Sequence, residues 1–145
     1  MKKSKFILLS VITCVILIST GCSQKESKLK CTQTASGVDI NFNVSFKGRL
    51  IETMDFDYDM DLSKYSDVQI EAIGKQDFCS NVKSSMSQYK NAFTDCKQEI
   101  TDKHLKVYSV LDVDKIAKNL LDKMSSAEAA KKELEKQGYK CTITK

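Results

Sequence analysis

The sequence predicts an α+β fold, in which one domain contains an antiparallel β-sheet packed against a long helix and C-terminal helices, with two disulfides. Two adjacent stretches alternate apolar and polar residues with a period of two, which is typical of half-buried strands. Later stretches carry apolar residues near a 3.6-residue period, which indicates amphipathic helices. Strands and helices do not alternate regularly, so an antiparallel sheet is favoured over a doubly wound one.

The first half of the domain is predicted to be strands. Residues 29–34 form a first strand. Residues 38–46 alternate strictly, and residues 50–61 resume the alternation after a turn at Lys47 and Gly48. These segments predict a hairpin over residues 38–61 with one face covered.

A long helix is expected from about residue 66 to 90. The alternative is that this helix is interrupted at Gly74. Ser66 and Gln69 have the spacing of a capping box at its start. Two strands, at about 93–100 and 103–111, follow it.

The C-terminal third is expected to be helical up to its last strand. Asp112 or Asp114 begins a helix whose apolar residues are Ile116, Leu120, Leu121 and Met124. Ser125 and Glu128 fit a second capping box, and Gly138 is a suitable residue after the helix end. A short strand with Tyr139, Cys141 and Ile143 on one face closes the chain.

Residues 1–21 have the order of features found in a lipoprotein signal peptide. Lys2, Lys3 and Lys5 precede a mostly apolar run over residues 6–18, and small residues lead to Cys22. The run is about 13 residues, short of the roughly 20 needed to cross a bilayer. Ser19 departs from the aliphatic residue usual three positions before the lipidated cysteine. We expect cleavage before Cys22, lipidation of Cys22, a tether over residues 22–27 and a domain over residues 28–145; an uncleaved anchor and ordinary secretion are the alternatives.

Net charge argues against a nucleic-acid partner. The chain has 23 basic and 19 acidic residues, and three of the basic residues lie before Cys22. The expected mature chain therefore has a net charge near +1, so the basicity belongs to the signal.

Four cysteines remain once Cys14 leaves with the signal and Cys22 takes the lipid: Cys31, Cys79, Cys96 and Cys141. An even number in an exported domain indicates two disulfides, with three possible connectivities. Zinc is the alternative, but no two of the four have the close spacing of a zinc site.

Chain geometry favours one pairing. From Cys79 to a helix end near Lys90 is about 16 Å at the helical rise. From Asn91 to Cys96 is also about 16 Å at the strand rise. A strand that folds back along the helix therefore pairs Cys79 with Cys96, which leaves Cys31 to pair with Cys141 and tie the first strand to the last.

The strongest candidate for a metal site is a row of aspartates at every second position: Asp55, Asp57, Asp59 and Asp61. An EF-hand starting at Asp55 would need Gly and Glu where Met60 and Ser66 stand. Carboxylates on one strand face are also about 6.5 Å apart, too far to surround one ion alone. The row is therefore interpreted as a solvated strand face that discourages edge pairing.

No catalytic constellation is recognisable. His104, the one histidine, lies at a predicted turn and is read as an exposed polar residue. The sequence contains no C-x-x-C, G-x-S-x-G, H-E-x-x-H or glycine-rich phosphate loop. We expect no enzymatic activity and no cofactor.

The order of these elements resembles the small YehR-like bacterial lipoproteins and their Gram-positive relatives. The likeness rests on the Gly21–Cys22 pair, the hairpin, the helix and two strands that follow, and the string from Ala130 to Cys141. It implies one α+β domain with an antiparallel sheet, and it supplies no catalytic residue. Cys79 and Cys96 are an addition to the family pattern.

The sequence therefore predicts a lipoprotein anchored on the extracytoplasmic face of a bacterial membrane, with a binding domain whose protein or small-molecule partner is unknown. A divalent-metal-binding module and a carboxylate-based envelope hydrolase are the alternatives.

Overall fold

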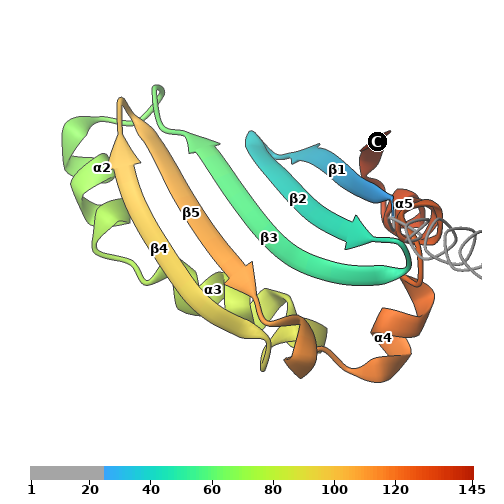
Figure 1. Cartoon of the computed structure of the whole chain (residues 1–145). Coiled ribbons are helices and arrows are strands. Elements are labelled where there is room, and N and C mark those ends of the chain that lie inside the picture. The colour runs from blue at the N-terminus through green and yellow to red at the C-terminus, as the bar shows by residue number, and fades with distance from the viewer. Residues whose placement is uncertain (1–24) are drawn as a thin grey trace, which may run out of the picture.

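The computed structural model describes residues 25–145, so the predicted signal peptide, its cleavage site and the lipidated Cys22 lie outside the described residues. Six antiparallel strands form one sheet, with helices against one of its faces (Figure 1). The strands are β1 (Glu26–Ala35), β2 (Val38–Lys47), β3 (Leu50–Asp61), β4 (Phe93–Thr101), β5 (His104–Leu111) and β6 (Lys140–Thr144). The predicted single-domain α+β class is confirmed. Within residues 25–145, no helix has both the length and the apolar content needed to cross a bilayer.

The strands lie in the order β4-β5-β3-β2-β1-β6. The predicted hairpin is β2 with β3, whose register places Phe42 opposite Phe56. β1 begins at Glu26, so it includes two residues that were expected in the tether. β4 and β5 form a second hairpin, and β5 pairs with β3. The last strand, β6, pairs with the first, β1.

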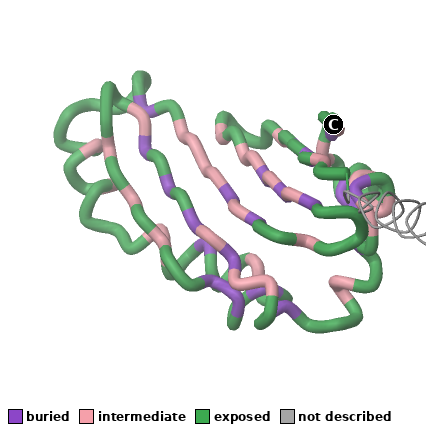
Figure 2. The backbone as a smooth tube through the Cα atoms, in the orientation of Figure 1, coloured by how far each residue is buried: buried purple, intermediate pink, exposed green. Residues whose placement is uncertain are grey.

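Strand alternation separates a covered face from an open one. The covered face holds large apolar side chains that are almost completely buried, among them Leu29, Phe42, Phe46, Met54, Leu105 and Val107. Figure 2 shows this alternation of buried and exposed positions along the strands. Burial of each such side chain stabilises the fold by roughly 1.5–3 kcal/mol.

The unbroken helix predicted for residues 66–90 is wrong, whereas the alternative of an interruption at Gly74 is confirmed. The segment divides into α2 (Asp67–Gly74), α3 (Phe78–Ser85) and the 3₁₀ turn η1 (Ser87–Tyr89). Ser66 and Gln69 do form the predicted capping box of α2. Gln98 of β4 stabilises the break: its Oε1 accepts the Phe78 N–H at 2.9 Å, and its Nε2 donates to the Gln76 carbonyl at 2.8 Å. A distant strand thus satisfies backbone groups that a continuous helix would have bonded internally.

C-terminal helices are present as expected, but the first is shorter than predicted. The segment contains η2 (Val113–Lys115), α4 (Lys118–Lys123) and α5 (Ala127–Lys136), so Ile116 precedes α4 and Met124 follows it. Asp112 caps η2, and Ser126, not Ser125, caps α5 by accepting the Ala129 N–H.

The expected role of Gly138 is confirmed. Gly138 has φ +93°, and the Tyr139 N–H donates to the Leu134 carbonyl while the Gly138 N–H donates to the Glu135 carbonyl. These two bonds are the Schellman ending of a helix, which turns the chain directly into β6.

Two disulfides are present, Cys31–Cys141 and Cys79–Cys96, the pairing expected from the sequence. Cys31 and Cys141 are direct partners in the β1–β6 register. Cys79–Cys96 joins α3 to β4. This second pair forms as expected, although the helix that leads from Cys79 toward β4 ends at Ser85 and does not continue to residue 90.

The two disulfides should contribute unequally to stability. Cys31–Cys141 spans 110 residues and Cys79–Cys96 spans 17. Restriction of the unfolded chain predicts losses of about 4.7 and about 3 kcal/mol when each is removed. In urea unfolding, the Cys31→Ala/Cys141→Ala variant should lose more free energy of unfolding than Cys79→Ala/Cys96→Ala; the reverse order would contradict this account.

Candidate functional site on the open face of the sheet

The candidate site lies on the face of the sheet opposite the helices. Alternation in the strands places polar side chains on this open face, and the register aligns them across neighbouring strands. Lys30 of β1 stands opposite Asn43 of β2, which stands opposite Asp55 of β3. The open face therefore carries a row of a cation, an amide and a carboxylate across three strands.

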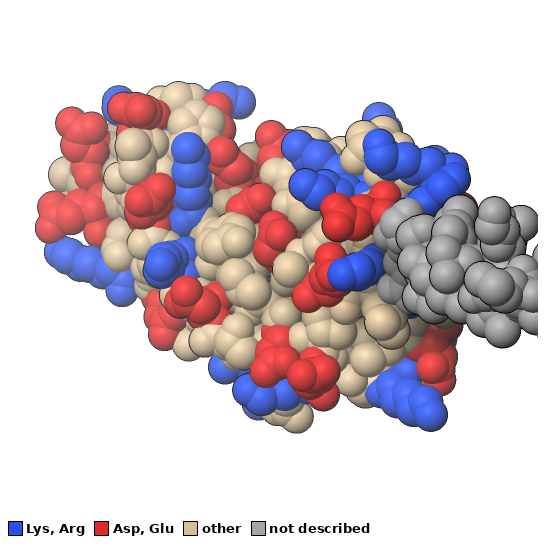
Figure 3. Space-filling view, in the orientation of Figure 1, with Lys and Arg blue, Asp and Glu red and all other residues tan. Residues whose placement is uncertain are grey.

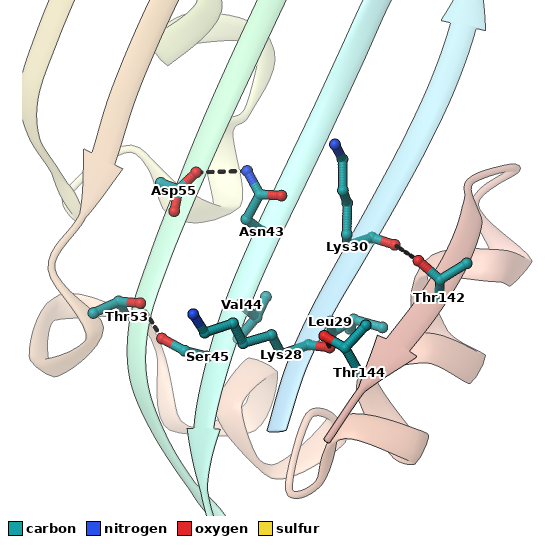
Figure 4. A pocket seen from close by; sticks show the side chains of 10 residues that line it. All are labelled: Lys28, Leu29, Lys30, Asn43, Val44, Ser45, Thr53, Asp55, Thr142 and Thr144. Carbon is teal, nitrogen blue, oxygen red and sulfur yellow. Dashed lines mark hydrogen bonds between the residues drawn. The ribbon is translucent and has the colours of Figure 1, made fainter. Parts of the chain in front are cut away.

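A hollow of about 420 Å³ lies on this face where β6, β1, β2 and β3 run side by side (Figure 4). Its size suits a small ligand or one end of a larger molecule. The hollow is lined by Lys28, Leu29, Lys30, Asn43, Val44, Ser45, Thr53, Asp55, Thr142 and Thr144.

Hydrogen bonds fix the β2–β3 side of the hollow. Asn43 Nδ2 donates to Asp55 Oδ1 at 2.7 Å and lies 3.5 Å from Asp57 Oδ2. The hydroxyls of Ser45 and Thr53 bond each other across the same two strands. The acceptors and hydroxyls of this wall are therefore held in place before any ligand arrives.

The opposite side of the hollow is basic and less constrained. Lys28 and Lys30 form no ion pair within residues 25–145. Thr142 and Thr144 make long hydrogen bonds, 3.5 and 3.4 Å, to the carbonyls of Lys30 and Lys28. Two ammonium groups are thus available to an incoming acceptor, and the two hydroxyls can reach it only by giving up these long bonds.

The aspartate row lies on the open face, as a shared strand face requires, but its members have separate contacts. Asp55 lines the hollow, Asp59 bonds His104, and Asp61 accepts the Ser63 N–H at 2.8 Å. That last bond lowers the pKa of Asp61. In the described part of the chain, no three His, Cys, Asp or Glu side chains are grouped to hold a metal ion.

Asp57 is the carboxylate on this face whose pKa is raised. Partial burial is the main cause, and the neighbouring charge of Asp55 adds to it. The Asn43 hydrogen bond and the charge of Lys30 act in the opposite direction. Lys30 is thus close enough for its field to reach Asp57, although no contact joins them.

His104 differs from its expected role as an isolated, exposed turn residue. Its Nδ1 lies 2.7 Å from Asp59 Oδ1, and its side chain is 42% exposed. Its partner in the strand register is Asp61, so the contact with Asp59 is diagonal. Neither residue lines the hollow. Sequence reasoning missed this pair because nothing in the sequence showed that β5 would lie beside β3.

Comparisons with known proteins concern the fold alone. No family model and no curated relative matches the sequence. The chain is similar to the solution structure of the Escherichia coli YehR protein, with 20% identity, a TM-score of 0.45, and coverage of 82% of this chain and 92% of that one. It is also similar to a protein from Streptococcus pneumoniae TIGR4, with 10% identity, a TM-score of 0.44, and coverage of 81% and 84%.

Replacement of Asp57 should reveal the cost of its charge. The pKa of Asp57 is raised above 3.8 in the folded protein, so its ionisation is less favourable there than in the unfolded chain. The folded state therefore loses stability as the pH rises through these pKa values. At lower pH the carboxyl is protonated in both the folded and the unfolded protein, and this loss is absent. Asp57→Asn should therefore raise the melting temperature relative to wild type more at pH 7 than at pH 3. Glu99→Gln, at an exposed position of β4, is the control and should show no such difference. Equal effects of Asp57→Asn at both pH values would contradict this assignment.

Proposed function

We propose that this chain is a lipid-anchored, extracytoplasmic, non-enzymatic binding domain that holds its ligand in the hollow of the open face. It would then be a member of the YehR-like lipoproteins that its sequence resembles. The hollow is the observation that carries the proposal, because it combines a preset polar wall with Lys28 and Lys30, which form no ion pair within the described residues 25–145. Binding sites are typically concave and present a few fixed polar groups.

The signal-like sequence supports the location. A basic segment, an apolar run and Gly21–Cys22 precede the described domain. β1 begins at Glu26, four residues after Cys22, so the tether between anchor and sheet would be short.

The disulfides support an exported location independently. Such bonds persist in oxidising compartments and are rare in the cytosol, and this domain contains two that join distant parts of the chain. Both bring a helix or terminal strand to a fixed place in the sheet.

The polar groups of the hollow favour binding over catalysis. Asn43 is bonded to Asp55 and Ser45 to Thr53, so these groups satisfy one another and are not arranged as a nucleophile with its base. His104 and Asp59, which have base-like geometry, lie apart from the hollow.

Intact-mass analysis of full-length protein extracted from its own membrane tests the proposed anchor and compartment. We expect a chain that starts at Cys22, carries a diacylglycerol and is four hydrogens lighter than the reduced form. The Cys22→Ala variant, which has no thiol to modify, should lack the lipid mass. A wild-type mass that starts at Met1, or that shows free thiols, would contradict the proposed anchor or the proposed compartment.

A further inference from the structure

Around the hollow, charge on the open face is divided between two sides, although farther out Lys106 of β5 lies beside Asp59 and Lys97 lies on β4. Lys28 and Lys30 of β1 and Lys140 of β6 lie on one side, and the aspartates of β3 lie on the other. Near the hollow, β2 separates them with the neutral side chains of Asn41, Asn43 and Ser45, and Asp39 lies at the far end of the same strand. Figure 3 shows basic side chains gathered near β1 and acidic ones along the middle of the face.

The two sides are close enough for one small ligand to reach both. β1 and β3 are each one strand from β2, so their backbones are about 10 Å apart. Lys28, Lys30 and Asp55 all line the same hollow, so their charged groups face one space. A ligand over Asn43 and Ser45 would touch both walls of the hollow.

Ligands of a single charge fit this arrangement poorly. An anion drawn to Lys28 and Lys30 also meets Asp55 in the same hollow. A cation drawn to Asp55 meets the two lysines. A molecule with an anionic and an ammonium group places each charge beside its opposite. This complementarity favours such a molecule over ligands that carry only one of the two charges.

We propose that the hollow binds a zwitterionic group, with its phosphate or carboxylate against Lys28 and Lys30 and its ammonium against Asp55. The inference rests on the proposed function, because it names the ligand class of the same site. Asn43 and Ser45 lie beneath the middle of the ligand, and its anionic end lies beside Thr142 and Thr144, whose hydroxyls would exchange their long bonds to backbone carbonyls for bonds to the anion.

The place of the hollow relative to the proposed anchor bears on the source of this ligand. Lys28 is six residues after Cys22, a span of at most about 20 Å in extended chain. A zwitterionic lipid headgroup in the anchoring membrane is therefore within reach, as is a free small molecule of the same chemistry.

Thermal shift of the full-length, disulfide-bonded protein in non-ionic detergent tests the ligand class. The probes are O-phosphoethanolamine, inorganic phosphate and ethanolamine, because a ligand that binds the folded state raises its melting temperature. We expect phosphoethanolamine to bind at least about tenfold more tightly than either half, since each half lacks one charge contact. Equal binding of phosphate alone, or no shift with phosphoethanolamine, would overturn the zwitterion proposal.

Variants locate the site. Lys28→Gln/Lys30→Gln should lose at least about tenfold in affinity for phosphoethanolamine, as expected for lost charge contacts. Lys97→Gln is the matched control, because Lys97 is a lysine of the same sheet outside the hollow and should bind unchanged. Asp55→Asn should weaken binding of phosphoethanolamine and strengthen binding of phosphate. Unchanged affinities in Asp55→Asn would overturn the role of that carboxylate.

Reconstitution distinguishes the two sources. If headgroups fill the hollow, protein in phosphatidylethanolamine vesicles should no longer bind soluble phosphoethanolamine, whereas protein in phosphatidylglycerol vesicles should still bind it. If protein in both kinds of vesicle binds soluble phosphoethanolamine, the ligand of the hollow is a free small molecule and not a lipid headgroup. A failure of these probes would not affect the mass of the lipidated chain, so this inference and the proposed anchor fail by separate measurements.

Discussion

The arrangement of the open face depends on one constraint, the disulfide between Cys31 and Cys141. It joins strands that are 110 residues apart in sequence and sets them as direct partners at the β1–β6 edge. Closing so long a loop is costly in chain entropy, and β6 has only five residues to offset that cost with hydrogen bonds. The disulfide lowers the cost by restricting the unfolded chain. With β6 in place, α5 covers the buried side of the same edge through Ala130 and Leu134.

The hollow follows from this edge. Thr142 and Thr144 lie on β6, directly across from Lys30 and Lys28, and they form the outer wall of the hollow. The inner wall comes from the β2–β3 hairpin, where Asn43 and Asp55 are bonded to each other. The two walls therefore come from opposite ends of the chain. Alternation along β1 buries Leu29 and Cys31 on the helix side and places Lys28 and Lys30 on the open side. The core and the candidate site are therefore formed by opposite faces of the same strands.

Local pattern predicted the strands better than the helices. Residues 38–61 alternate so strictly that the hairpin, its turn and the shared face of the aspartates all followed from the sequence. The helix over residues 66–90 did not form because Gln98, 20 residues after Phe78, bonds the backbone at the break. No local pattern contains that contact. The hollow and the His104–Asp59 pair were missed for the same reason, since both depend on which strands are neighbours.

The central claim is that the Cys31–Cys141 bond holds β6 in the sheet and so completes the candidate site. Amide hydrogen exchange of wild type and the Cys31→Ala/Cys141→Ala variant tests it most directly. The account predicts that amides of β6, and of the β1 positions paired with it, exchange faster in the variant while those of β2, β3 and β5 stay protected. Equal protection of β6 in both proteins would show that hydrogen bonds and α5 suffice without the disulfide, and would contradict the account.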